Sequence, residues 1–178
     1  SAQNLKKHYG SVRALDRVTF DIEPGVTGLL GANGAGKSTA LKLFLGLLQP
    51  DSGRADFLAI PGAGPIDARQ RIGYMPEHDC LPGALPAAEF LTHMAEVSGL
   101  PRVAARVRAT DMLRHVGLFE ERYRAIGTYS TGMKQRVKLA QALVHDPVVV
   151  LLDEPTAGLD PGGRQDMLDL IRSTGRDF

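Results

Sequence analysis

A glycine-rich run at residues 31–39 carries the residue types that bind phosphate. It reads Gly-Ala-Asn-Gly-Ala-Gly-Lys-Ser-Thr, and Gly31, Gly36, Lys37 and Ser38 fit the pattern Gly-x-x-x-x-Gly-Lys-[Ser/Thr]. Glycines let the backbone turn tightly and aim its N–H groups inward at phosphate oxygens. The lysine can reach β- and γ-phosphates, and the serine hydroxyl can ligate Mg²⁺. The run therefore predicts a nucleotide phosphate site; the alternative is a glycine-rich turn with an exposed lysine.

Two carboxylates follow an apolar run much further along the chain. Residues 148–152 are all apolar, which is typical of a strand buried on both faces of a parallel sheet. Asp153 and Glu154 come directly after it. A buried carboxylate is costly without a partner, and a hydrated Mg²⁺ suits Asp153. Glu154 could orient and deprotonate a water that attacks a phosphoryl group. Taken alone, both could instead be solvated turn acids before Pro155.

Strands and helices must hold these side chains in place. Residues 26–30 read as a short apolar strand that leads into the glycine-rich run. Residues 38–48 read as a helix whose positive N-terminal end would face the phosphates. The order of strand, phosphate loop and helix predicts an α/β fold. The apolar face of this helix is expected to contain Leu41, Phe44, Leu45 and Leu48.

Two further motifs decide the family. Residues 129–136 read Tyr-Ser-Thr-Gly-Met-Lys-Gln-Arg, and residues 157–160 read Ala-Gly-Leu-Asp. Together with the phosphate loop (Walker A) and the acid-ended strand (Walker B), they resemble the ATP-binding cassette (ABC) ATPase family over essentially the whole chain. The first of them, the signature segment, is most similar to ATP-binding subunits of bacterial exporters for drugs, antibiotics or lipid-like molecules.

The resemblance implies a fold as well as a family. It predicts an α/β P-loop NTPase (RecA-like) core with a small antiparallel β subdomain in the first 30 residues. A helical insert is expected at about 86–126, and a single ABC ATPase domain over residues 1–178. Within the insert, one apolar face is expected from Phe90, Leu91, Met94 and Val97, and another from Val103, Val107, Leu113 and Val116.

Roles for individual residues also follow from the resemblance. Tyr9 matches the aromatic residue that stacks on adenine, although it could be an ordinary strand aromatic. Ser130 and Gly132 match the signature residues that contact the γ-phosphate held by the opposite subunit. From the residues alone, Ser130 is a good N-cap for a helix that runs to Val144. Asp160 matches a loop that communicates between two sites, and it also reads as the N-cap of the next helix.

The remaining assignments concern the phosphates, the metal ion and the base. Glu154 matches the catalytic base. The ligands implied for Mg²⁺ are Ser38, Glu77 and Asp153. The residues implied to hold ATP through its phosphates are Gly31, Ala32, Asn33, Gly34, Ala35, Gly36, Lys37, Ser38 and Thr39.

Three positions depart from the family pattern. Glu77, in the sequence Ile-Gly-Tyr-Met-Pro-Glu, stands where glutamine is usual. Its carboxylate can still approach Mg²⁺ or the attacking water, but its charge changes the local electrostatics. Thr131 and Met133 replace the commoner glycine and glutamine of the signature. Thr131 adds bulk beside the path of the phosphate.

A further departure is an absence. The family carries a histidine at the end of the strand after Walker B. The five histidines of this chain all lie upstream of Walker B, and the helix expected from Pro161 to about Thr174 should lead into the missing strand. The sequence is therefore expected to be a fragment of a longer protein, without the C-terminal strand and the switch histidine.

Composition excludes several classes of protein. The chain has 178 residues, a net charge of +1 and one cysteine. This charge gives no reason to expect binding to nucleic acid or to an anionic membrane. The single cysteine, Cys80, argues against a disulfide scaffold and suits a reducing cytosol. No apolar run reaches the length of a membrane-spanning helix, so a peripheral position on the cytoplasmic face of the inner membrane is expected.

The resemblance to the ABC family implies an ATPase subunit that drives a transporter, with export favoured. Two copies, or this chain and a similar one, would sandwich two ATP molecules, and a separate transmembrane permease would dock on the helical insert and the Glu77 loop. One alternative is a soluble ABC ATPase acting on ribosomes or DNA, which would carry two cassettes, a long coiled coil or zinc-binding cysteines. Another is a degenerate cassette that binds ATP without hydrolysing it.

Overall fold

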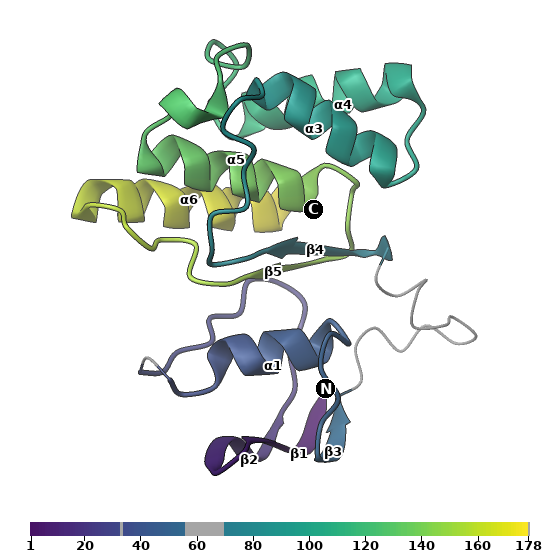
Figure 1. Ribbon diagram of the computed structural model, residues 1–178, viewed down its shortest axis with the longest axis vertical. Coiled ribbons are helices and arrows are strands. Elements are labelled where there is room, and N and C mark those ends of the chain that lie inside the picture. The colour runs from purple at the N-terminus through teal and green to yellow at the C-terminus, as the bar shows by residue number, and fades with distance from the viewer. Residues whose placement is uncertain (33, 56–69, 178) are drawn as a thin grey trace. The chain divides into compact units, whose positions relative to one another are not determined.

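The computed structural model describes residues 1–32, 34–55 and 70–177, which fall into two compact units. Unit 1 spans Ser1–Arg69 and unit 2 spans Gln70–Phe178. Their elements carry the labels of Figure 1. Unit 1 holds β1 (Ala2–Tyr9), β2 (Val12–Phe20), α1 (Lys37–Phe44) and β3 (Ser52–Ala55). Unit 2 holds β4 (Ile72–Met75), α3 (Ala87–Val97), α4 (Arg102–His115), the short 3₁₀-helix η1 (Ile126–Thr128), α5 (Thr131–Leu143), β5 (Val149–Leu152) and α6 (Pro161–Asp177).

Unit 1 is a small antiparallel sheet with one helix. The strand order is β2-β1-β3, and β1 and β2 form a hairpin in which Tyr9 pairs with Val12. Leu5 and Leu15 are buried in its core. The rings of Phe20 and Phe44 meet edge to face with their centroids 5.6 Å apart, which ties α1 to the end of β2. The small antiparallel sheet predicted from the sequence is confirmed.

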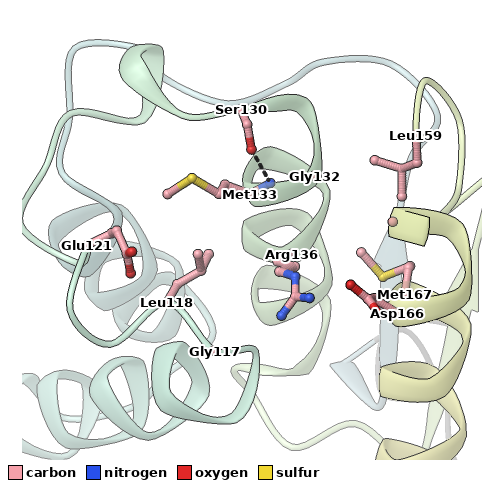
Figure 2. Close-up of a pocket in the computed structure, with 11 residues that line it drawn as sticks. Gly117, Leu118, Glu121, Ser130, Gly132, Met133, Arg136, Leu159, Asp166 and Met167 are labelled. Carbon is pink, nitrogen blue, oxygen red and sulfur yellow. Dashed lines mark hydrogen bonds between the residues drawn. The ribbon is translucent and has the colours of Figure 1, made fainter. Parts of the chain in front are cut away.

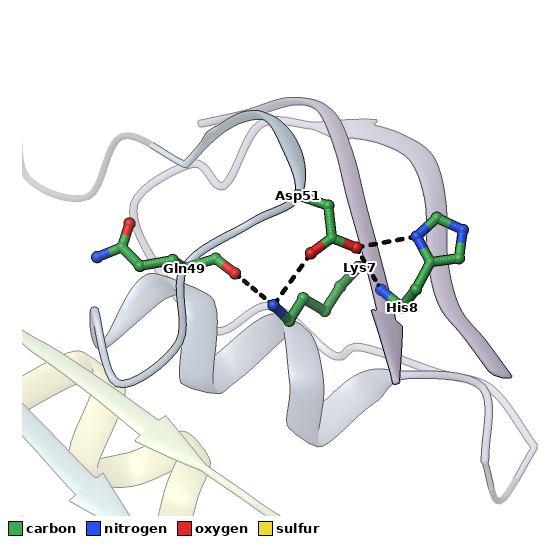
Figure 3. Close-up of polar contacts among 4 residues, drawn as sticks. All are labelled: Lys7, His8, Gln49 and Asp51. Atoms are coloured by element: carbon green, nitrogen blue, oxygen red, sulfur yellow. Dashed lines mark hydrogen bonds and ion pairs between the residues drawn. The ribbon is translucent and has the colours of Figure 1, made fainter. Parts of the chain in front are cut away.

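A polar cluster joins β1 to the segment before β3 (Figure 3). The Lys7 ammonium donates hydrogen bonds to the backbone carbonyl of Gln49 at 2.7 Å and to the Asp51 carboxylate at 3.2 Å. The backbone N–H of His8 donates to the same carboxylate at 2.6 Å, and the His8 ring lies 2.9 Å from it. These hydrogen bonds, first from the His8 ring and then from Lys7, hold the pKa of Asp51 below its ordinary value.

Unit 2 is built in layers, with α5 between the α3–α4 pair and the sheet (Figure 1). β4 and β5 are parallel, in a register that pairs Ile72 with Val149 and Met75 with Leu152. α5 packs on β4 at very close range, because a Cβ added at Gly73 would lie 2.0 Å from the carbonyl oxygen of Ala142. Only glycine allows this approach. The core of the unit is one apolar cluster that includes Leu91, Leu113, Ile126, Val137, Leu139 and Leu143.

The helical insert is confirmed as α3, α4 and η1, but each of its two predicted apolar faces is only partly right. On α3, Phe90 and Leu91 are buried and Met94 packs against the core, whereas Val97 is exposed. On the second face, Leu113 and Val116 are buried as predicted. Val103 and Val107 are exposed, and Ala105 and Ala109 are buried in the first half of α4 instead. Close packing of α4 against α3 and α5 favours small side chains, so the larger valines lie outside.

The predicted strand at residues 26–30 is also wrong. This segment has no regular secondary structure, and the side chain of Leu30 is 94% exposed. A strand of this kind needs neighbouring strands to satisfy its backbone. Among the described residues of unit 1, the three strands pair only with one another. The helix that follows is also shorter than predicted, since α1 ends at Phe44.

No helix in the described ranges is long and apolar enough to cross a lipid bilayer.

We predict that the Asp51→Asn variant melts at a lower temperature than the wild type at neutral pH, because asparagine keeps an oxygen acceptor but loses the charge. A carboxyl group whose folded-state pKa is lowered stabilises the fold above its ordinary pKa, and loses this effect as the pH falls through the lowered value. The difference in Tm should therefore shrink below about pH 4. Thermal melts across this range in low salt would test it.

The same melts in high salt provide a control, since screening should reduce the difference between the two proteins for contacts as exposed as these. A difference that is independent of both pH and salt would contradict a role for the charge.

Candidate functional site

The glycine-rich loop of unit 1 is folded for close approach of an anion. Gly34 and Gly36 have φ values of 81° and 86°, which glycine adopts readily. Gly36 also leaves no room for a side chain, because a Cβ there would lie 2.3 Å from the carbonyl oxygen of Ala14. α1 begins at the next residue, Lys37. Its ammonium turns back over the loop and donates to the carbonyls of Gly31 at 2.9 Å and Ala32 at 3.2 Å.

The other predicted residues of unit 1 lie on defined elements, with one exception. Ala35 donates its backbone N–H to Ala32 inside the loop at 3.1 Å. Ser38 and Thr39 lie in the first turn of α1. Tyr9 ends β1, and its side chain is about half exposed, so its ring is accessible for stacking. Asn33 lies outside the described residues.

In unit 2, two acidic residues lie where the parallel strands end. The backbone N–H of Asp153 donates to the carbonyl of Met75 at 2.9 Å, which continues the pairing of β5 with β4. Asp153 is 4% exposed, whereas Glu77, two residues beyond β4, is exposed. Burial, the charge of Asp153 and a hydrogen bond to Asp153 together raise the pKa of the Tyr74 hydroxyl. The carboxyl end of this sheet therefore carries both predicted acidic metal ligands of the chain.

The donor set at this edge fits Mg²⁺. Carboxylate oxygens are the ligands that a hard cation prefers, and Mg²⁺ in phosphate-transferring sites is held by one or two carboxylates together with phosphate and water. In the parts of the chain that the structure describes, no group of three or more His, Cys, Asp or Glu residues could form an all-protein cage. Glu77 and Asp153 could each contribute a carboxylate oxygen to a Mg²⁺ ion that also binds phosphate and water.

Glu154 begins the turn that follows β5. Its φ of 50° is uncommon for a residue with a side chain. The backbone N–H of Ala157 donates to the carbonyl of Glu154 at 3.0 Å and closes the turn. The unusual backbone redirects the chain directly after the buried Asp153, so the two neighbouring acids have different environments.

The signature segment caps α5. The side chain of Ser130 accepts a hydrogen bond from the backbone N–H of Met133 at 3.2 Å, so the predicted N-cap is confirmed. Gly132 lies in the first turn, and the exposed Thr131 lies against Gly158, where an added Cβ would come 3.2 Å from its methyl group.

A pocket of about 370 Å³ opens beside this end of α5 (Figure 2). Ser130, Gly132 and Met133 line it from α5, and Asp166 and Met167 line it from α6. Arg136 also lines the pocket, and it donates to the carbonyl of Val116 at 2.9 Å. The guanidinium thus joins the first turns of α5 to the end of α4.

One charged residue of the site was missed by sequence reasoning. Lys138 lies in the middle of α5 and is only 3% exposed. Its ammonium donates to the backbone carbonyl of Glu77 at 2.9 Å, and burial lowers its pKa. The available signal was a lysine on a helix whose neighbours Val137 and Leu139 are apolar.

The model of a family described as ABC transporter matches residues 15–157. The chain is 43% identical over 173 residues to an uncharacterized ABC transporter ATP-binding protein of Bacillus subtilis strain 168, covering 97% of this chain and 57% of the relative. It is 40% identical to the Nod factor export ATP-binding protein I of Burkholderia pseudomallei strain 1710b, covering 96% of this chain and 57% of that protein.

A solved structure has a similar fold. The match to cbiO1 from Clostridium perfringens, part of the ABC transporter complex cbiONQ, has a TM-score of 0.88 at 32% identity, and covers 99% of this chain and 73% of that one. The predicted fold class, an ABC ATPase fold, is confirmed by this match. The chain spans 57% of the length of both sequence relatives.

We predict that Ser130→Ala destabilises the protein by about 1 kcal/mol, because the N–H of Met133 loses its acceptor at the start of α5. Ser130→Thr keeps the hydroxyl oxygen and should lose less. Urea unfolding followed by circular dichroism would measure the shift. Equal midpoints for the wild type and the alanine variant would show that the cap contributes nothing.

Proposed function

The chain belongs to the ABC transporter family, and on this premise we propose that it binds ATP with Mg²⁺ and hydrolyses it to energise a membrane transporter. The observation that carries the proposal is the conformation of the glycine-rich loop. Two glycines with positive φ precede the N-terminus of α1, and the Lys37 ammonium lies over the loop. Backbone N–H groups, a helix N-terminus and a lysine are what a chain of phosphates requires.

Each part of the nucleotide has a proposed partner. Residues 31–39 hold the phosphates, with Lys37 on the β- and γ-phosphates, and Tyr9 stacks on adenine. Ser38, Glu77 and Asp153 hold Mg²⁺, which when bound neutralises the charge that develops on the phosphate oxygens. Ser130 and Gly132 face the γ-phosphate of a second subunit, where the capped N-terminus of α5 offers a favourable partial charge.

Hydrolysis requires one proton transfer from the attacking water to a residue of this chain. Glu154 accepts a proton from the attacking water as the water oxygen bonds to the γ-phosphorus. The bond from that phosphorus to the bridging oxygen of the β-phosphate breaks, and ADP and inorganic phosphate leave. The position of Glu154 supports this role, because it follows the buried Asp153 directly and is less buried than that residue.

The proposed partners are a transmembrane permease and a second ATP-binding subunit, either a copy of this chain or a similar one. ATP would join the two subunits and hydrolysis would release them, so that the permease changes state with each cycle. Support for export comes from the Nod factor export protein among the relatives, and support for a multi-subunit complex comes from cbiO1. The chain would then lie at the cytoplasmic face of the inner membrane, held there by the permease.

We predict that Mg-ATP raises the Tm of the wild type by a few degrees and leaves Lys37→Ala unchanged. A ligand at about 100 times its Kd adds roughly 2.7 kcal/mol to the free energy of unfolding. Glu154→Gln should keep the shift, because the amide removes the base but not the phosphate contacts. Its hydrolysis rate should fall about 10²- to 10⁴-fold, the usual contribution of a general base.

The experiment combines melts with a phosphate-release assay on the intact protein. Absence of any shift in the wild type would overturn ATP binding. A shift without phosphate release would leave a cassette that only binds. Wild-type turnover in Glu154→Gln would remove Glu154 from the role of base.

A further inference from the structure

Lys138 of α5 is a charged residue buried among apolar residues. Lys138 is 3% exposed, and the residues on either side of it, Val137 and Leu139, belong to the apolar core. Removing an ammonium group from water is costly unless hydrogen bonds or charges compensate. A methionine of similar length would fill the same space without that cost. The presence of a lysine at this position therefore indicates a polar contact with a functional role.

That contact is with the segment that carries Glu77. The ammonium of Lys138 donates to the carbonyl of Glu77 at 2.9 Å. The carboxylates of Asp79, Glu77 and Asp153 act on the ammonium in the opposite sense to burial, because nearby negative charge favours its protonated form. Residues 77–80 belong to no helix or strand, so the hydrogen bond from Lys138 holds a segment without a regular hydrogen-bond ladder.

A second lysine on the same side of the helix provides an internal comparison. Lys134 lies one turn before Lys138, and its ammonium is 3.8 Å from the Asp79 carboxylate. Its side chain is 32% exposed, so water and salt screen this pair. Both lysines reach the segment 77–80, but only Lys138 does so from a buried position and to a backbone group.

We propose that Lys138 is a positioning residue that fixes the Glu77 segment on α5. Helix α5 would then hold two groups of the nucleotide site in a fixed relation. One is the Glu77 carboxylate, and the other is Ser130, which caps the same helix. A movement of α5 then carries both groups together. The inference rests on the proposed function for the meaning of the site, but the contact itself can be tested without nucleotide.

Cys80 supplies a probe at the right place. It is exposed, it is the only cysteine among the 178 residues, and it lies three residues after Glu77. A nitroxide label on Cys80 reports the mobility of the segment by electron paramagnetic resonance. In the nucleotide-free full chain, we expect the label to become more mobile in Lys138→Met than in the wild type. Lys134→Met, the matched control, should change its mobility much less.

Steady-state ATP hydrolysis provides the functional readout. Because Lys138 acts through Glu77 and does not touch the nucleotide, Lys138→Met should lower kcat about 10- to 100-fold, the range in which misplacing a catalytic group acts. The KM for ATP should stay within about threefold of the wild type, since ground-state contacts remain. Lys138→Gln, whose amide ends one bond short of the ammonium position, gives the same test if the methionine variant does not fold.

The outcomes separate this inference from the proposed function. Higher label mobility with a lower kcat and an unchanged KM supports the positioning role. The positioning role is overturned if the label in Lys138→Met is no more mobile than in the wild type or in Lys134→Met. It is also overturned if kcat falls and KM rises together in Lys138→Met. If the wild type neither binds nor hydrolyses ATP, the proposed function fails, while the label mobility still decides whether Lys138 holds the segment.

Discussion

The contact of α5 with β4 is the constraint on which unit 2 depends. At Gly73 the strand passes so close beneath the helix that no side chain fits between them. Strand and helix run in opposite directions, since Ala142 lies over Gly73 while Lys138, one turn earlier, reaches Glu77 beyond the end of the strand. The same approach that closes the apolar core thus sets how far the middle of α5 lies from the acidic end of the sheet. Core packing and site geometry are decided by one interface.

Because α5 lies at a fixed distance from the sheet, its polar side chains can hold the surrounding loops by hydrogen bonds. Gln135 donates to the carbonyl of Ala157 at 3.0 Å, Arg136 to that of Val116 at 2.9 Å and Lys138 to that of Glu77 at 2.9 Å. Each accepting group is a backbone carbonyl outside a regular helix or strand, and such groups need donors when water is excluded. The helix serves both as a core element, through its apolar residues, and as a frame for three loops.

The sequence predicted features that depend on local chemistry and missed those that depend on a distant partner. The cap at Ser130 and the strand before Asp153 could be predicted, because both follow from residue type and immediate neighbours. The strand is shorter and less buried than predicted, since it begins at Val149 and Val148 is exposed. A strand at residues 26–30 would need neighbouring strands to pair with, and a run of apolar residues in the sequence does not show whether they are there. On α4, hydrophobicity favoured Val107, but the space available favoured Ala109. Lys138 was missed because burial of a lysine depends on an acceptor far away in the sequence.

The left-handed backbone at Glu154 sets the stability of the fold against the proposed role of the Glu154 carboxylate. A φ of 50° costs a residue with a Cβ free energy that glycine avoids, and asparagine tolerates it better than glutamate. A screen for thermostable variants would therefore favour replacement of Glu154. That replacement would remove the carboxylate proposed as the base. If Glu154 is the base, such a replacement would gain stability and lose hydrolysis. A stabilised version of this scaffold would have to find its gains elsewhere.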